Sequence, residues 1–187
     1  MYDMGVIHGR FQVLHNDHMR YLLAGKELCR HLVVGITNPD PSLTGEVQED
    51  RTRSDALANP LSYFERLLLV RDSLLEVGLT YEEMTIVPLP ITQPKLFRHY
   101  VPFNAVFLLS IYDDWGRRKL DQFRQLSLET HVLWEVRPEE KGISASDVRE
   151  AMIDGREWEH LVPRPTAVRC RQWDIPGRLR KLRHARR

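Results

Sequence analysis

Residues 9–18 read Gly9-Arg10-Phe11-Gln12-Val13-Leu14-His15-Asn16-Asp17-His18. The apolar run Met4–Ile7 just before this stretch predicts a buried strand, and apolar residues at helical spacing over residues 19–23 predict a helix just after it. Either Asn16 or Asp17 is suited to cap that helix. The stretch therefore predicts a turn that leads from a strand into a helix.

Two histidines lie at this predicted turn. His15 falls just before the expected cap, and His18 falls in the first turn of the helix. Both rings can face the free backbone N–H groups and the positive dipole end of the helix, which favours a bound polyphosphate. Spacing alone equally allows two partly exposed polar residues beside a helix start.

A second motif, Ile143-Ser144-Ala145-Ser146-Asp147-Val148-Arg149, lies near the other end of the chain. Ser144 or Ser146 can cap a helix, and Asp147 suits its first turn. Arg149 offers a planar fork for bidentate phosphate binding. The alternative is a well-capped surface helix whose arginine pairs with Glu150 or solvent.

Length and composition predict one globular domain over residues 1–187. The chain is 42% hydrophobic with a net charge of +1, which gives no nucleic-acid-binding field over the whole surface. Cys29 and Cys170 are far apart and lack partner spacing, so we expect a reducing cytoplasm. No apolar run approaches the roughly 20 residues that span a bilayer, and the start of the chain has no signal-peptide pattern. We expect a soluble, cytoplasmic protein with no membrane partner.

Short apolar runs alternate with amphipathic segments, a pattern typical of a parallel sheet covered on both faces. The expected strands are Met4–Ile7, His31–Ile36, Met84–Leu89, Ala105–Leu109 and His131–Val136. Helices are expected after His15, from a capping box of Ser62 and Glu65, and from Trp115 to about Leu126. The order predicts a Rossmann-like α/β fold with a site at the carboxyl ends of the strands, followed by a C-terminal helical segment.

Two further segments allow two interpretations each. The stretch from Thr37 to Leu61 is rich in proline and charge and predicts a surface loop, either a substrate lid or an inert insertion. Residues 164–187 hold eight arginines and one lysine against the single acid Asp174. They form either an arm that binds RNA or phosphate or, as we prefer, an amphipathic helical extension packed on the domain or on a neighbouring subunit.

The two motifs resemble the G-x-F-x-P-x-H-x-G-H and I-S-S-T-x-I-R elements of the nucleotidyltransferase superfamily. The first element is matched at Gly9, Phe11, His15 and His18. Val13 replaces its proline, and Asp17 replaces its second glycine, which puts a carboxylate beside the expected phosphates. Two motifs in the right order and context are a much stronger signal than one.

Within that superfamily the chain is most similar to archaeal-type nicotinamide-nucleotide adenylyltransferases. The resemblance extends to the segments 59–66, 87–91, 154–163 and 178–182. It implies that the 5′-phosphate of nicotinamide mononucleotide attacks the α-phosphorus of ATP, giving NAD and pyrophosphate. It also implies a homo-oligomer and a Mg²⁺ ion that bridges the ATP phosphates, with no dedicated metal ligands from the protein.

The resemblance assigns roles to individual residues. The residues that it implies for catalysis are His15, His18 and Arg149, and those for ATP and its phosphates are Gly9, Arg10, Phe11, Gln12, Ser144 and Ser146. For the acceptor, Phe97 falls where the archaeal enzymes carry a tryptophan and is expected to stack on the pyridine ring, unless it is a core residue. Trp115 is a second ring that can stack on the acceptor, although a tryptophan at a helix start is more often a packing residue.

One departure keeps other functions open. The family has S-G-N after its fourth strand, whereas this chain has Ser110-Ile111-Tyr112-Asp113-Asp114-Trp115. The alternatives are a nucleotidyltransferase for another phosphorylated acceptor, such as nicotinate mononucleotide, and a non-catalytic regulator that binds nucleotides or RNA. An aminoacyl-tRNA synthetase is disfavoured because the chain is too short to add tRNA-reading domains.

Overall fold

The computed structural model describes residues 1–40, 55–137, 140 and 142–185. Most of the stretch predicted as a lid or an inert insertion falls on residues 41–54, outside the described residues. None of the helices within the described ranges is both long and apolar enough to cross a bilayer.

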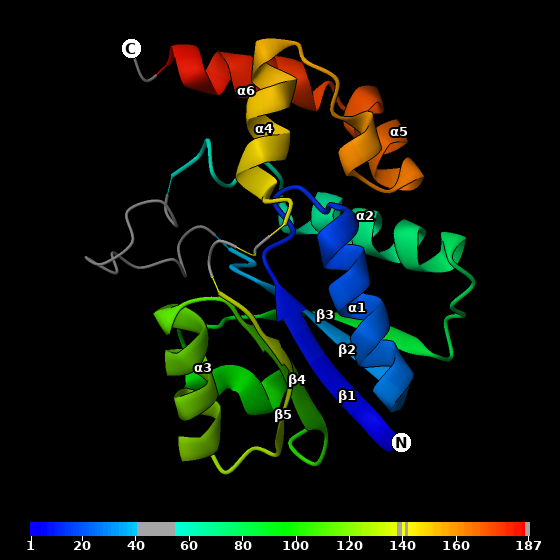
Figure 1. Cartoon of the computed structure of the whole chain (residues 1–187), viewed down its shortest axis with the longest axis vertical. Helices are drawn as coiled ribbons and strands as arrows, with labels where there is room; N and C mark the ends of the chain where they lie inside the picture. Colours follow the sequence, from blue (N-terminus) through cyan, green and yellow to red (C-terminus); the bar gives the residue numbers. More distant parts are fainter. Residues whose placement is uncertain (41–54, 138–139, 141, 186–187) are drawn as a thin grey trace. The chain divides into compact units, whose positions relative to one another are not determined.

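Five parallel strands form one sheet. They are β1 (Tyr2–Gly9), β2 (Cys29–Thr37), β3 (Met84–Leu89), β4 (Val106–Ile111) and β5 (Thr130–Glu135). Their order across the sheet is β3-β2-β1-β4-β5 (Figure 1). All five predicted strands are confirmed, with ends that differ by two residues or fewer, and the order is Rossmann-like.

The strand order reverses between β1 and β4, at the centre of the sheet. Strand β1 stays paired with β2 as far as Gly9 and Ile36, but its last pair with β4 joins Ile7 to Leu108. The carboxyl ends of β1 and β4 therefore part at His8. In open α/β sheets such a reversal point is where ligands bind.

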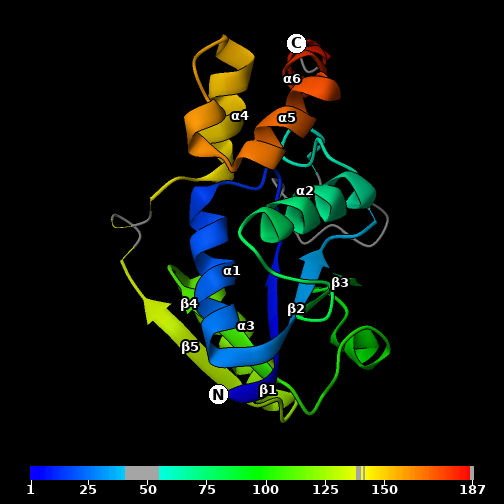
Figure 2. The same ribbon diagram turned by 90° about the vertical axis from the view of Figure 1, so that its right-hand side faces the viewer.

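Helices cover both faces of this sheet. Gly25 of α1 (Asn16–Leu28) lies so close to Ile7 that an added Cβ would come within 2.8 Å of its side chain. Phe123 of α3 (Asp114–Gln125) packs against Phe107 on the opposite face, with ring centroids 5.2 Å apart. Because alternate strand residues point to opposite faces, these contacts place the two helices on different sides of the sheet (Figures 1 and 2).

The described chain divides into two compact units that are interleaved in sequence. The first consists of residues 1–9, 20–37 and 79–142, and the second of residues 10–19, 38–78 and 143–187. The first unit holds the sheet, α3 and the short helix η3 (Pro94–His99). The expectation of a single domain over residues 1–187 stays a prediction.

The second unit is mainly helical. Its helices are α2 (Tyr63–Glu76), α4 (Ala145–Asp154), η5 (Glu159–Leu161), α5 (Arg164–Gln172) and α6 (Ile175–His184). Helix α5 contacts α2 and α6, and α6 contacts α4 (Figure 2). The predicted capping box of α2 is present, since Ser62 accepts from the Glu65 amide and the Glu65 carboxylate accepts from the Ser62 amide.

The basic C-terminal segment forms two helices, because the chain turns at Asp174, which has a φ of 47° and caps α6. Ile175 and Leu179 are fully buried, so the apolar side of α6 packs within the second unit, where α6 contacts α4 and α5. Several of its arginines pair with acids of the same unit: Arg169 with Asp72, Arg171 with Glu159, Arg178 with Glu65, and Arg183 with Asp154.

Candidate active site

The two histidines of the first motif meet at the start of α1. The helix begins at Asn16, and the Met19 amide donates its hydrogen bond to the His15 carbonyl at 3.1 Å. His15 therefore occupies the cap position, and the prediction that Asn16 or Asp17 caps the helix is wrong. The physical reason is that the imidazole of His15 itself accepts from the His18 amide at 3.4 Å, as a capping side chain does.

The two imidazoles are stacked, with centroids 3.6 Å apart and planes inclined by 26°. The His15 amide donates to Nδ1 of His18 at 3.3 Å, which mirrors the bond from the His18 amide to Nδ1 of His15. Because both Nδ1 atoms accept hydrogen bonds, the ring protons are assigned to the Nε2 atoms. The pair thus presents two N–H donors on rings that are held by the backbone. Phe11 supports it, with its ring edge-on to His18 at 5.1 Å.

The residues between the histidines tie the first motif to the C-terminal segment. Asp17 Oδ2 accepts a hydrogen bond from the Ile143 amide at 2.7 Å, and Asn16 Nδ2 donates to the His160 carbonyl at 2.9 Å. The carboxylate that replaces the family's glycine therefore holds the backbone at the beginning of the second motif.

The second motif forms the start of α4. Ser144 caps the helix in a capping box with Asp147, as one of the two predicted alternatives required. Ser146 accepts from Arg149 Nη2 at 3.0 Å, and Arg149 Nη1 donates to the Gln12 carbonyl. The structure thus joins the arginine of one motif to the backbone of the other.

Arg149 is only 7% exposed. Burial lowers its pKa to about 10, and the positive charge of Arg10 acts in the same direction. The guanidinium remains charged at neutral pH, and its burial increases the strength of its interaction with an anion. An anionic ligand would compensate the cost of this burial.

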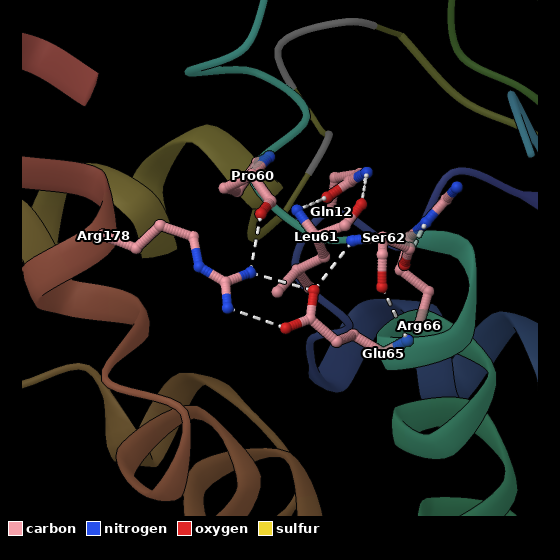
Figure 3. A network of polar contacts seen from close by, with 7 residues as sticks. All are labelled: Gln12, Pro60, Leu61, Ser62, Glu65, Arg66 and Arg178. Carbon is pink, nitrogen blue, oxygen red and sulfur yellow. Dashed lines mark hydrogen bonds and ion pairs between the residues drawn. The ribbon is translucent and has the colours of Figure 1, made fainter. Parts of the chain in front are cut away.

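Gln12 has a structural role in the described chain. Its side-chain amide donates to the Leu61 carbonyl at 2.8 Å and accepts from the Leu61 amide at 2.9 Å (Figure 3). Arg66 supports the same region, since its guanidinium donates to the carbonyls of Arg10 and Asn38 at 2.9 and 2.8 Å. Together these residues hold the backbone of the 10–15 turn in place.

The C-terminal helix reinforces this arrangement. Arg178 donates through both Nη atoms to the carboxylate oxygens of Glu65, at 2.8 and 2.9 Å, and also to the Pro60 carbonyl at 3.0 Å (Figure 3). Glu65 is part of the α2 capping box, directly beside the Leu61 backbone that holds Gln12. A chain of hydrogen bonds therefore runs from α6 to the first motif.

The predicted phosphate-site residues belong mostly to the second unit, which brings together Arg10, Phe11, Gln12, His15, His18, Ser144, Ser146 and Arg149. Gly9 ends β1 in the first unit.

The two predicted acceptor residues also belong to the first unit. Phe97 is fully buried among apolar side chains, edge-on to Phe123 at 6.1 Å, and Trp115 lies beside the cations of Arg118 and Lys119 at 5.9 and 5.7 Å. Stacking on an acceptor stays a prediction for both.

Sequence reasoning missed Arg66, Arg178 and the anchoring role of Asp17. Arg66 directly follows the capping-box glutamate, but no local pattern reveals which carbonyls its side chain reaches. Among the described residues, no group of three or more His, Cys, Asp or Glu side chains is arranged to hold a metal ion.

No protein-family model matches the chain. A phosphonoformate cytidylyltransferase from Streptomyces viridochromogenes is 47% identical over 176 residues, which cover 94% of this chain and 95% of that protein. The chain belongs to the nucleotidyltransferase superfamily. A nicotinamide-nucleotide adenylyltransferase from Thermococcus kodakarensis is 30% identical over 189 residues, covering 97% of this nucleotidyltransferase and 89% of that protein.

Solved structures agree with this fold. A bifunctional NMN adenylyltransferase/ADP ribose pyrophosphatase from Francisella tularensis matches with a TM-score of 0.70 at 16% identity. The match covers 97% of this nucleotidyltransferase and 53% of that chain, so the protein spans about half of the neighbour's length. A putative nicotinate-nucleotide adenylyltransferase from Vibrio parahaemolyticus gives a TM-score of 0.59 at 12% identity, with 96% of each chain covered. These likenesses support the predicted fold, while the curated relatives support nucleotidyl transfer.

Proposed function

We propose that this enzyme transfers the cytidylyl group of CTP to a small phosphonate acid of the phosphonoformate type and releases pyrophosphate. The observation that carries the proposal is the 47% identity to a phosphonoformate cytidylyltransferase over nearly the full length of both chains. Seven nicotinamide-nucleotide adenylyltransferases are 24–30% identical to it.

In this reaction a phosphonate oxygen attacks the α-phosphorus of CTP. A P–O bond forms there as the bond to the β-phosphate oxygen breaks, and that electron pair leaves with pyrophosphate. Negative charge is spread over the phosphoryl oxygens, so catalysis depends on positioning and on well-placed donors rather than on a covalent nucleophile.

The phosphate-site residues suit these tasks. The Nε2–H groups of His15 and His18 would donate to the reacting phosphates, and their fixed stacking limits reorganisation. Arg149, held by Ser146, would hold the outer phosphates and stabilise the departing pyrophosphate. Ser144 would act mainly by capping α4 and directing its first amides toward the phosphates.

Magnesium enters this proposal as part of the nucleotide substrate. The ion would be carried by the triphosphate, which supplies the oxygen ligands that it prefers. A bifunctional neighbour of the same fold was crystallised as a complex with AMP and a manganese ion. Activity should therefore disappear with EDTA and return with Mg²⁺ or Mn²⁺.

The second candidate is adenylyl transfer from ATP to nicotinamide mononucleotide, which the 30% identity to the Thermococcus enzyme favours. A pyridine ring would need a stacking partner. Phe97, which falls at the expected position, has no exposed surface and would have to leave the core to serve. This burial favours a small acceptor without a ring.

The test measures pyrophosphate release from CTP or ATP, each with phosphonoformate, nicotinamide mononucleotide, nicotinate mononucleotide or no acceptor. We expect release with CTP and phosphonoformate, and a product whose mass equals the sum of CMP and phosphonoformate minus water. Release only with ATP and a pyridine mononucleotide would overturn the proposal in favour of the second candidate. Nucleotide binding without release under any combination would leave a non-catalytic regulator.

A further inference from the structure

Arg66 of α2 is a buried cation whose guanidinium donates to three backbone carbonyls. The side chain is 2% exposed. Its Nη1 and Nη2 atoms donate to the carbonyls of Arg10 and Asn38 at 2.9 and 2.8 Å, and its Nε atom donates to the Ser62 carbonyl at 3.2 Å. All four residues belong to the second unit. One planar group therefore joins the start of α2 to the two segments that follow β1 and β2 in the sequence.

Both of these segments contain a residue with a left-handed backbone conformation. Phe11, which directly follows the Arg10 carbonyl, has a φ of 52°, and Asn38 itself has a φ of 51°. This conformation is uncommon for residues other than glycine, and it is least favourable for a bulky side chain such as phenylalanine. It persists only where the surrounding structure fixes it. The hydrogen bonds of Arg66 fall at both of these strained positions.

Arg66 also adds positive charge beside the 10–15 turn. Burial lowers its pKa to about 10, and the positive charge of Arg10 acts in the same direction. The guanidinium is therefore charged at neutral pH. Arg149, the other buried arginine of this region, donates to the Gln12 carbonyl, two residues further along the same turn. Two buried cations thus hold carbonyls of one turn, an arrangement that favours a bound anion.

We propose that Arg66 is a positioning residue for nucleotide binding. Its hydrogen bonds hold Phe11 and Asn38 in their left-handed conformations, and they thereby keep the 10–15 turn in the shape that receives a polyphosphate. Arg66 acts through the backbone of this turn and needs no contact with the ligand. The inference rests on the proposed nucleotidyl transfer, and it assigns a role in that reaction to a residue outside both motifs.

The test compares Arg66→Met and Arg66→Lys in the full chain, with inorganic pyrophosphate as the probe in titration calorimetry. Methionine has a long, unbranched side chain without a donor, whereas lysine keeps the charge but lacks the planar fork. We expect the Kd for pyrophosphate to rise about 10- to 100-fold in the methionine variant, because the turn loses its hydrogen bonds to a charged group. Lysine should recover only part of this affinity, since it cannot donate in the same fixed directions.

Calorimetry separates a positioning role from a merely structural one. The stoichiometry reports the fraction of protein that is folded, whereas the Kd reports the site in the molecules that have folded. A merely structural role would lower the stoichiometry and the melting temperature and leave the Kd unchanged. Arg71→Met is the matched control, because Arg71 lies on the same helix and pairs with Asp72 at 2.7 Å. This variant should bind pyrophosphate as tightly as wild type.

Hydrogen exchange tests the cause of the lost affinity. Peptides that cover residues 10–15 and 36–40 should exchange faster in Arg66→Met than in wild type, because the carbonyl bonds that fix both segments are gone. A peptide that covers α5 should exchange at the rate of wild type. Equally faster exchange over the whole second unit would show a general loss of stability and would overturn the inference.

Two further outcomes would overturn it: an unchanged Kd in Arg66→Met, or a lysine variant that binds as tightly as wild type, since charge alone would then suffice. If wild type binds pyrophosphate but transfers no nucleotide with any substrate pair, the proposed function fails, and the comparison of Kd values still decides for Arg66. If wild type does not bind pyrophosphate, both the proposed function and the inference fail.

Discussion

Asp17 accepts a hydrogen bond from the backbone amide of Ile143 at 2.7 Å, across 126 positions of sequence. The bond joins the first turn of α1 to the segment that leads into α4, and so links the two motifs that carry the side chains proposed to bind phosphate. Asp17 stands where the signature that the chain resembles has a glycine, so a carboxylate anchor occupies a position at which glycine would allow close approach to the backbone.

Replacing Asp17 with glycine should slow the enzyme. The Ile143 amide would lose its acceptor and the second motif would be held less firmly, so we expect kcat/KM for CTP to fall about tenfold. Asp17→Asn is the matched control, since its amide oxygen can still accept the bond and most of the activity should remain. Steady-state kinetics would decide, and a faster glycine variant would mean that the carboxylate hinders phosphate binding.

His18→Ala should reduce kcat about 10²- to 10³-fold, because it removes one fixed donor to the developing charge. The fold should survive, since the change leaves the α1 backbone and the buried core intact. His99→Ala is a suitable control, as His99 is exposed on η3. Circular dichroism and pyrophosphate release would be measured together. Loss of activity through unfolding would remove the support for a catalytic histidine.

Arg149→Met should abolish the stabilisation that CTP gives to the protein. Binding of a ligand to the native state raises the melting temperature according to its concentration and affinity. Wild type should therefore melt at a higher temperature in millimolar Mg-CTP, whereas the variant should not respond. Because the methionine removes a buried cation, the variant without nucleotide should not be much less stable. An unchanged shift in the variant would exclude Arg149 from phosphate binding.

Arg178→Met should destabilise the fold by about 1 kcal/mol in urea denaturation, since Glu65 would lose a two-pronged partner. Arg171→Met is the control. Its ion pair with Glu159 is more exposed, so we expect a cost below about 0.5 kcal/mol.

The effect of Arg178→Met should also depend on pH. Burial alone would raise the pKa of Glu65, but hydrogen bonds from Arg178 and Ser62 outweigh it and lower the pKa from its ordinary 4.5. The stabilisation is therefore complete above the ordinary pKa and is lost as the pH falls through the lowered one. The difference in stability between wild type and the variant should shrink below about pH 4. A difference that is constant from pH 7 to pH 3 would contradict this.

The strands, the Ser62 capping box and the Ser144 cap follow from local patterns, and the sequence predicts them well. Such features depend on alternation, on helical spacing and on polar residues at helix starts, all of which lie within a few residues of each other. The cap of α1 was harder to predict, because the side chain that accepts the capping hydrogen bond is an imidazole, whereas asparagine and aspartate are the usual capping residues.

The contacts of Asp17, Arg66 and Arg178 could not be predicted from the sequence. Each reaches a carboxylate, a carbonyl or an amide more than 25 positions away, and no spacing rule encodes such a pairing. The surroundings of Phe97, which is expected to contact the acceptor, could not be predicted from the sequence either. Phe97 follows the family pattern in position, yet its neighbours place it in the core, which only a three-dimensional arrangement can show.

The interleaving of the two units has a consequence for biosynthesis. Residues 143–187 supply Arg149 and α6 to the second unit, and they leave the ribosome after residues 1–142. A nascent chain that has reached β5 already contains His15 and His18, but it lacks the arginine beside the Gln12 carbonyl and the helix that reinforces Glu65. The proposed phosphate site is therefore assembled only after residues 143–187 have been made, and we expect a product truncated before α4 to be an inactive fragment rather than a weaker enzyme.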